Sequence, residues 1–334
     1  MLKKRFLLLL AISCLLLVTA LLFVGCEQAT VTTTLVFEQD FDSIEIDAKW
    51  SNVVLEKSHD DKCYVEFVEA EKIVHSAKID EYNRLKITFD EHSAWQDHLG
   101  TEYTKYKITV RLPKDTYSGV TIKSRTGTFF LSEDIKYSFV YARTNMGSVI
   151  CNASTLYSID IKTDTGIIGV SNISCGSKLS LESTSGAITV KNVQCEQMVV
   201  ISSVTGSINC YDVTASNLGA YSEGSGSIYL ENVRVSNSLG IKAETGTVRC
   251  VDSIGENEFY VETTTAYATI DRCDSKRIFF STDKGTIIAN LLSPKDFDVK
   301  NEKGTINFPE NGSSSDGDGL LVTETGTITV TIAQ

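Results

Sequence analysis

Hydrophobic and polar residues alternate along most of the chain, and from Val120 onward the alternation repeats about every 20 residues. Each repeat contains two alternating stretches separated by a turn that usually reads Ser-Gly or Thr-Gly. A period of two residues is typical of β-strands, whereas an amphipathic helix has a period of about 3.6. Each repeat is therefore predicted to hold two strands and one turn. The residues at the glycine position are Gly127, Gly147, Gly166, Gly186, Gly206, Gly226, Gly246, Ala266, Gly285, Gly304 and Gly326.

A fixed repeat of this length indicates one coil of backbone laid on the next, which is a solenoid. Strands of successive coils are expected to pair in parallel, with equivalent apolar residues stacked inside about 4.8 Å apart. We predict an all-β fold, a parallel β-solenoid (β-helix) of about eleven coils over residues 119–334. Residues 35–118 lack the clean period but keep the alternation, and we expect them to form an N-terminal β cap.

Two polar ladders are expected to stabilise the turns. We attribute the glycine to a turn that needs a positive φ. Asn or Asp six residues after the glycine tolerates a left-handed corner, and stacked amides can bond along the axis. These corner residues are Asn172, Asn192, Asp212, Asn232 and Asp252. The hydroxyl residues three before the glycine, expected to bond to the turn backbone, are Ser124, Thr144, Thr163, Ser183, Ser203, Thr263, Thr282 and Thr323.

The first residues are typical of an export signal. A basic start is followed by an apolar stretch to Val24 and by Gly25-Cys26. This pattern resembles a bacterial lipoprotein signal, so residues 1–25 are interpreted as a signal peptide, Cys26 as the lipidation site and residues 26–34 as a tether. Phe23 departs from the leucine usual in such signals. The apolar stretch is also long enough to span a bilayer, so an uncleaved helical anchor is the alternative.

The interpretation of residues 1–25 as a signal peptide affects the expected net charge and cellular location. The formal net charge of the chain is −12, and removal of a signal with three basic and no acidic residues takes it to about −15. This balance excludes a nucleic-acid partner. We expect an extracytoplasmic protein, lipid-anchored to the cell membrane, whose partners are that membrane and a glycan or protein ligand.

Most cysteines occupy apolar columns and are interpreted as small core residues. Cys175 and Cys195 take equivalent places on adjacent coils, where a disulfide is one outcome and free thiols the other.

Candidate catalytic residues are few. Two residues before the glycine, the last three repeats carry Asp283, Glu302 and Glu324. Stacked carboxylates about 5 Å apart are typical of a retaining glycosidase. They are also compatible with Ca²⁺ binding or with a solvated turn edge, and we favour the last. The loop containing His92, Trp95 and His98 lacks a recognised ligand spacing. No enzyme activity and no cofactor or metal is expected.

Aromatic residues at outward positions are candidates for a sugar or protein contact surface, although they can equally cover one another between coils. They are Phe130, Tyr141, Tyr229, Tyr260, Tyr267 and Phe279.

Three stretches carry a family resemblance: residues 41–56, residues 110–130 and the run of x-Thr-Gly-x-Ile-x-Val units. The chain resembles the bacterial β-strand-repeat proteins of unknown function that are often labelled putative adhesins. The resemblance covers the chain from about Leu35 onward. It implies a solenoid facing the cell envelope, mostly in Gram-positive bacteria, and supplies no catalytic residues.

Three functions stay open at this point. The first is a membrane-tethered surface protein, an adhesin or a scaffold that presents a rigid face to a ligand. The second is an envelope-stress or signalling accessory protein. The third is a polysaccharide-active enzyme that uses the three stacked carboxylates.

Overall fold

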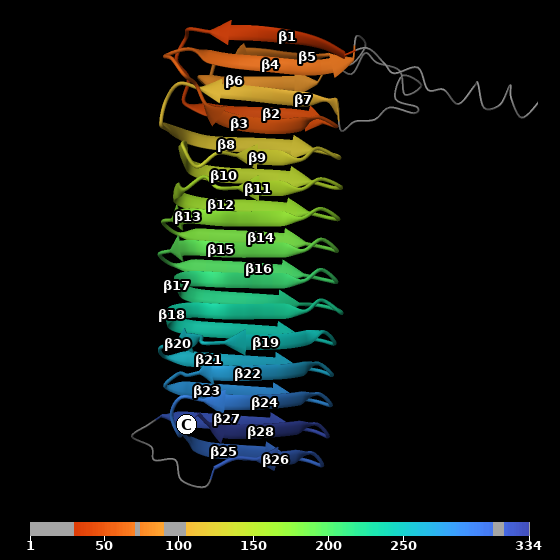
Figure 1. Cartoon of the computed structure of the whole chain (residues 1–334), viewed down its shortest axis with the longest axis vertical. Coiled ribbons are helices and arrows are strands. Elements are labelled where there is room, and N and C mark those ends of the chain that lie inside the picture. Colours follow the sequence, from red (N-terminus) through yellow and green to blue (C-terminus); the bar gives the residue numbers. More distant parts are fainter. Residues whose placement is uncertain (1–29, 71–73, 90–104, 310–316, 334) are drawn as a thin grey trace, which may run out of the picture.

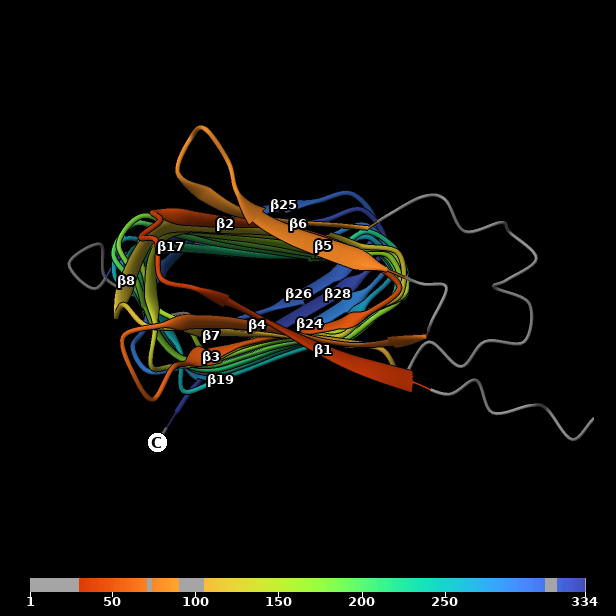
Figure 2. The same ribbon diagram turned by 90° about the horizontal axis from the view of Figure 1, so that it is seen from above.

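Alternate side chains of each strand are buried, as the period of two predicts. In a computed structural model of the protein, which describes residues 30–70, 74–89, 105–309 and 317–333, β15 (Ile188–Cys195) and β16 (Met198–Ser203) both alternate between buried and more exposed positions. The strands form a flattened solenoid with two long walls and two narrow edges (Figures 1 and 2). The fold class predicted from the sequence is thus confirmed.

Wall A consists of one strand from each coil, paired in parallel. In spatial order these are β6 (Arg84–Phe89), β2 (Ser43–Lys49), β8 (Thr116–Ser124), β10 (Lys136–Thr144), β12 (Thr155–Thr163), β14 (Lys178–Ser183), β16, the second half of β17 (Ile208–Ser222), the second half of β18 (Ile228–Ala243), β21 (Glu258–Thr263), β23 (Arg277–Thr282), β27 (Asp318–Thr323) and β25 (Asp296–Asn301).

Wall B lies opposite and holds the second strand of each coil. In spatial order these are β7 (Lys107–Leu112), β3 (Asn52–Lys57), β9 (Phe129–Leu131), β11 (Val149–Cys151), β13 (Ile168–Cys175), β15, the first halves of β17 and β18, β19 (Thr247–Val251), β22 (Tyr267–Cys273), β24 (Thr286–Leu291), β28 (Thr327–Ile332) and β26 (Thr305–Asn307).

The N-terminal end of the stack is closed by antiparallel strands. β4 (Cys63–Ala70) pairs with β7 on one side and with β1 (Thr30–Phe37) on the other. β5 (His75–Ile79) pairs with β6. The parallel coils therefore continue beyond the first clean repeat into residues 43–57 and 84–112, and antiparallel pairing begins only outside them. Antiparallel end strands give the last parallel edge a partner and cover the core.

The interior between the walls is a set of vertical apolar columns. Ile168, Ile188, Ile208 and Ile228 are paired in register on successive coils, and each is at most 1% exposed. Burying one such side chain stabilises the fold by about 1.5–3 kcal/mol. Each coil shares its inner face with the coils above and below, so no coil has a separate core.

The repeat glycines serve a different purpose from the predicted one. Among the described glycines, only Gly317 has a positive φ, at 111°, so the expectation of a positive φ at the turns was wrong. A Cβ built on Gly186 would instead lie 1.7 Å from the carbonyl oxygen of Gly166, and one on Gly166 would lie 1.6 Å from that of Gly147. The carbonyl of one turn fills the space where the next turn's side chain would be. Glycine is required by contact between coils, not by backbone conformation.

The polar ladders are confirmed in part, because the hydroxyls of Thr144, Ser203 and Thr323 have no hydrogen-bond partner. Asn172 and Asn192 have φ values of 57° and 52°, and Asn192 Nδ2 donates to Asn172 Oδ1 at 2.9 Å. Arg272 continues the left-handed column with a φ of 50° and pairs with the Asp252 carboxylate at 2.6 Å. At the turns, the Gly186 amide donates to Ser183 Oγ at 2.8 Å. A second edge, which we call the return edge, is formed where wall B leads into wall A just after the Asn column.

Both ends of the stack depart from chain order. The coil of β27 and β28 lies between the coil of β23 and β24 and the coil of β25 and β26. At the other end, the coil of β2 and β3 lies between that of β6 and β7 and that of β8 and β9. The sequence period had indicated stacking in chain order, which holds only between β8 and β24.

The glycine column generates a stability prediction. Gly186→Ala places a methyl group against the Gly166 carbonyl, and overpacking of this kind costs about 1–3 kcal/mol. The gain of about 0.4–1 kcal/mol from a stiffer unfolded chain is smaller. Chemical denaturation should therefore show a lower midpoint for this variant. Thr184→Ala, an exposed change in the same turn, is the matched control and should unfold like the parent. Equal midpoints for the glycine variant and the control would show that the coils are not in contact here.

The Asn column generates a second prediction. Asn192→Ala loses the amide bond to Asn172 and also the short polar side chain that lets asparagine adopt the left-handed region, at a cost of about 1–3 kcal/mol. Asn192→Gly loses the same bond but tolerates the φ, so it should destabilise less. Thermal unfolding of both variants tests this order. The reverse order would mean that the corner is not held in the left-handed conformation.

Candidate functional site

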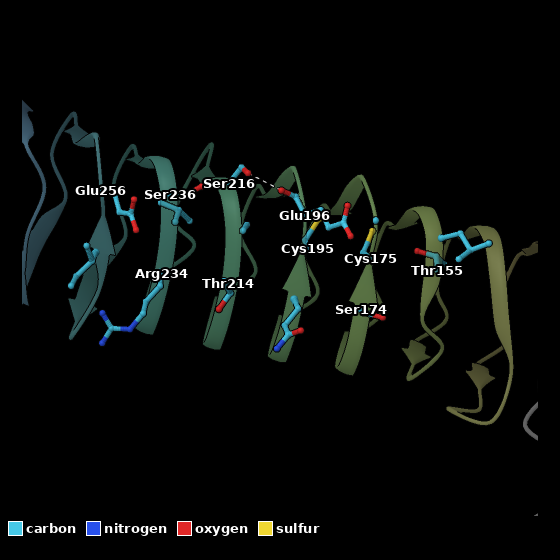
Figure 3. A pocket seen from close by; sticks show the side chains of 16 residues that line it. Thr155, Ser174, Cys175, Cys195, Glu196, Thr214, Ser216, Arg234, Ser236 and Glu256 are labelled. Carbon is cyan, nitrogen blue, oxygen red and sulfur yellow. Dashed lines mark hydrogen bonds between the residues drawn. The ribbon is translucent and has the colours of Figure 1, made fainter.

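A groove of about 780 Å³ runs along the return edge, parallel to the solenoid axis (Figure 3). It crosses the coils from Thr155 to Glu256 and is built from three residue columns at the corner where β13, β15, β17 and β18 leave wall B. At each corner one residue points inward and its two sequence neighbours point outward. With five coil spacings of about 4.8 Å, the groove is roughly 24 Å long.

The floor of the groove is made of small, buried residues. No floor residue is more than 6% exposed. The floor column contains Thr155, Cys175, Cys195, Ala215 and Val235. Because these side chains are short, the corner is recessed between the two rims.

The rims are mostly polar and repeat once per coil. Figure 3 shows Ser174, Thr214 and Arg234 on one side of the two sulfur atoms, and Glu196, Ser216 and Glu256 on the other. Gln194 belongs to the first rim and Ser236 to the second. Ser216 Oγ donates to the backbone carbonyl of Glu196 at 2.7 Å. The groove thus offers hydroxyl, amide and charged groups on both sides of an apolar floor.

Two thiols occupy neighbouring places in the floor. Cys175 and Cys195 are paired in register on β13 and β15, and both are free. Cys175 Sγ donates to the Tyr157 carbonyl at 3.3 Å, and Cys195 Sγ donates to the Met198 carbonyl at 3.3 Å. The neighbouring Cys195 thiol lowers the pKa of Cys175 below that of a free thiol, and the same interaction raises the pKa of Cys195. Of the two outcomes left open by the sequence, the structure holds free thiols.

The three carboxylates singled out from the sequence lie on the opposite, glycine-bearing edge. Their spatial order is Asp283, Glu324, Glu302, because the Glu324 coil is inserted between the other two. Backbone bonds fix this order, with the Thr325 amide donating to the Asp283 carbonyl and the Lys303 amide to the Glu324 carbonyl. Glu302 and Glu324 are exposed and Asp283 is half-buried. They share no surface with the groove.

The outward aromatic residues are divided between the two walls. Tyr141, Tyr260 and Phe279 lie on wall A, whereas Phe130, Tyr229 and Tyr267 lie on wall B. They therefore do not form one face. The Arg143 guanidinium covers the Tyr141 ring at 3.9 Å, and Tyr229 Oη donates to Glu231 at 2.7 Å.

One aromatic pair was missed by the sequence analysis. Phe139 and Tyr157 stack on wall A with ring centroids 5.1 Å apart, and they are 50% and 54% exposed. Phe139 and Tyr157 stand at different numbers of residues before the glycine of their repeats. A register shift between Tyr137 and Phe139 nevertheless brings the two rings together. Tyr157 directly follows Leu156, a residue that lines the groove. The stack therefore lies near the Thr155 end of the groove.

Several sequence predictions lie outside the described residues: the signal, Cys26, and the loop with His92, Trp95 and His98. Within the ranges that the structure describes, no three His, Cys, Asp or Glu residues are grouped so as to hold a metal ion. In the same part of the chain, no helix is long and apolar enough to span a bilayer.

Comparison with known proteins places the chain in a family. It resembles a solved putative adhesin from Bacteroides fragilis NCTC 9343, with 15% identity, 92% of this chain and 100% of that chain covered, and a TM-score of 0.36. It also resembles a putative adhesin from Parabacteroides distasonis ATCC 8503, with 13% identity, 91% of this chain and 98% of that chain covered, and a TM-score of 0.45. A putative lipid binding protein from the same strain is similar as well, with 14% identity, 91% of this chain and 97% of that chain covered, and a TM-score of 0.38. A search of curated proteins found no sequence relative. The family model described as Toastrack DUF4097 matches residues 41–270, more than half of the chain, and confirms the resemblance inferred from the sequence. The chain belongs to the Toastrack DUF4097 family.

Proposed function

We propose that this protein is a membrane-tethered, extracytoplasmic scaffold that binds a linear glycan along the groove of the return edge. The observation that carries the proposal is the periodicity of the groove. On three consecutive coils its two rims present a pair of polar side chains above a floor of small residues, and these pairs are Gln194 and Glu196, Thr214 and Ser216, and Arg234 and Ser236. A site of this form suits a chain-like ligand better than a compact small molecule.

The spacing of the coils favours a glycan over an extended peptide. An extended polypeptide advances about 3.3 Å per residue, whereas the rim groups recur about every 4.8 Å. An extended peptide therefore advances about three residues for every two coils and does not offer the same group at each rim position. A polysaccharide whose sugar units each advance by about one coil meets an equivalent set of donors and acceptors at every step.

The chemistry of the lining agrees with a sugar ligand. The rims hold hydroxyl and amide groups from Ser174, Gln194 and Thr214, which can exchange hydrogen bonds with sugar hydroxyls. The stack of Phe139 and Tyr157 near one end offers an apolar ring surface of the kind that packs against a sugar face. The lining contains one basic residue, Arg234, and two acidic ones, Glu196 and Glu256, so it does not favour a polyanion.

The groove supports binding without hydrolysis. Glu196 and Glu256 are three coils apart, which corresponds to roughly 14 Å. Glycosidases place their two carboxyl groups about 5–9.5 Å apart. The closely stacked Asp283, Glu324 and Glu302 lie on the other edge of the solenoid. We therefore propose that the protein holds a glycan and does not cleave it.

The membrane tether is tested through Cys26. In a bacterial host, Cys26→Ala should abolish incorporation of a labelled fatty acid, because the chain loses its acylation site. Cys14→Ala, in the middle of the same apolar stretch, is the control and should keep both the label and the membrane location. A Cys26→Ala protein that stays in the membrane, with no label on the parent, would support the helical anchor instead.

Glycan binding is tested with the full chain in detergent on an array of linear polysaccharides. The Gln194→Ala/Arg234→Ala variant removes two rim contacts worth about 1 kcal/mol each and should bind roughly tenfold or more weakly. Thr205→Ala/Thr245→Ala, two exposed changes on the glycine edge, is the matched control and should bind like the parent. Failure of the parent to bind any glycan, or undiminished binding by the groove variant, would refute the proposal.

A further inference from the structure

The floor of the groove contains a cluster of heteroatoms that glycan binding does not use. Thr155, Cys175 and Cys195 follow one another on three successive coils, and all three are at most 5% exposed while lining the groove. Register pairing joins Thr155 to Cys175 and Cys175 to Cys195. The cluster therefore has two sulfur atoms side by side, open to solvent only through the groove.

A disulfide between these thiols would have to draw their Cβ atoms together, although a Cα separation of about 4.8 Å lies within the 4.4–6.8 Å that a disulfide accepts. Parallel strands are held about 4.7–4.9 Å apart, and side chains paired in register leave them in the same direction. A disulfide brings the two Cβ atoms to about 3.5–4.5 Å, with a mean near 3.8 Å. The β13–β15 ladder before the pair, and the hydrogen bond from the Glu196 amide to the Cys175 carbonyl at 2.9 Å after it, resist that approach. A bridge longer than a disulfide fits the spacing better.

We propose that Cys175 and Cys195 bind one soft monovalent cation of the Cu(I) or Ag(I) class as a two-thiolate bridge. A metal–thiolate bond is about 2.3 Å long, as for zinc, so two such bonds in line span about 4.6 Å. That length matches the separation of adjacent coils. Soft thiolate ligands select Cu(I), whereas a structural zinc site requires four ligands. The described residues supply no third or fourth His, Cys, Asp or Glu ligand.

Thr155 Oγ1 is buried without a hydrogen-bond partner, one coil beyond Cys175 on the side away from Cys195. Binding forms two metal–sulfur bonds and releases the thiol protons to water, and nothing is oxidised or reduced.

A second thiol pair in the chain provides a control. Cys250 Sγ and Cys273 Sγ are 3.6 Å apart, but both residues are fully buried between the walls and neither lines the groove. If proximity of sulfur atoms alone sufficed, both pairs would bind the ion. If access through the groove is required, only Cys175 and Cys195 will do so.

The experiment is a titration of the reduced full chain with Ag(I), and with Cu(I) against a chromogenic competitor, followed by native mass spectrometry. The parent should take up one tightly held ion. Cys175→Ser and Cys195→Ser should each lose it, and Cys273→Ala should retain it. Circular dichroism of all variants checks that the coils remain folded. X-ray absorption of the silver complex should show two sulfur neighbours.

Three results would overturn the proposal. The first is a parent protein that holds no ion tightly. The second is tight binding that persists in the Cys175→Ser/Cys195→Ser double variant. The third is formation of a Cys175–Cys195 disulfide on exposure to glutathione disulfide, seen as a mass loss of two hydrogens with an unchanged circular dichroism spectrum. That result would assign the two thiols to a disulfide. None of these results bears on glycan binding, which the rim variants test separately.

Discussion

Direct contact between the backbones of neighbouring coils is the constraint on which this structure depends. At the glycine edge the carbonyl of Gly166 occupies the space that a side chain at Gly186 would need. This contact sets the coils at the separation of paired strands, and the same separation then governs every column of the interior. Ile188 and Ile208 stack because their coils cannot move apart without losing the strand hydrogen bonds.

The same separation turns an ordinary corner into a site. At the return edge a left-handed residue such as Asn192 redirects the chain, and the second buried position after it carries a small side chain such as Cys195 or Ala215. Repetition of this corner over successive coils converts a shallow recess into a continuous groove. The regular spacing of the rim side chains along the groove comes from the stacking of the coils and not from the sequence within one coil. The scaffold thus supplies the pitch of the site, and individual residues supply its chemistry.

Much of the fold was predictable because its determinants recur. The alternation of buried and exposed residues, the two strands per coil and the left-handed corner at Asn192 all follow from a period visible in the sequence. The reason for the glycines was not predictable, because the clash at Gly186 involves a carbonyl on another coil. The order of the end coils was missed because β27 has the same register as any other strand of wall A. The groove was missed because Ser174 and Arg234 look like ordinary exposed strand residues until the corner is seen in three dimensions.

The interleaved coils have a consequence for how the molecule comes apart and forms. A stack built in chain order can fray from its tip, one coil at a time. Here the outermost coil, β25 and β26, pairs within the described residues only with β27 and β28. Detaching β27 and β28 strips away two layers together, so the tip opens as a double unit. During synthesis, β25 and β26 emerge before β27 and β28, so the strands with which they pair are made only afterwards.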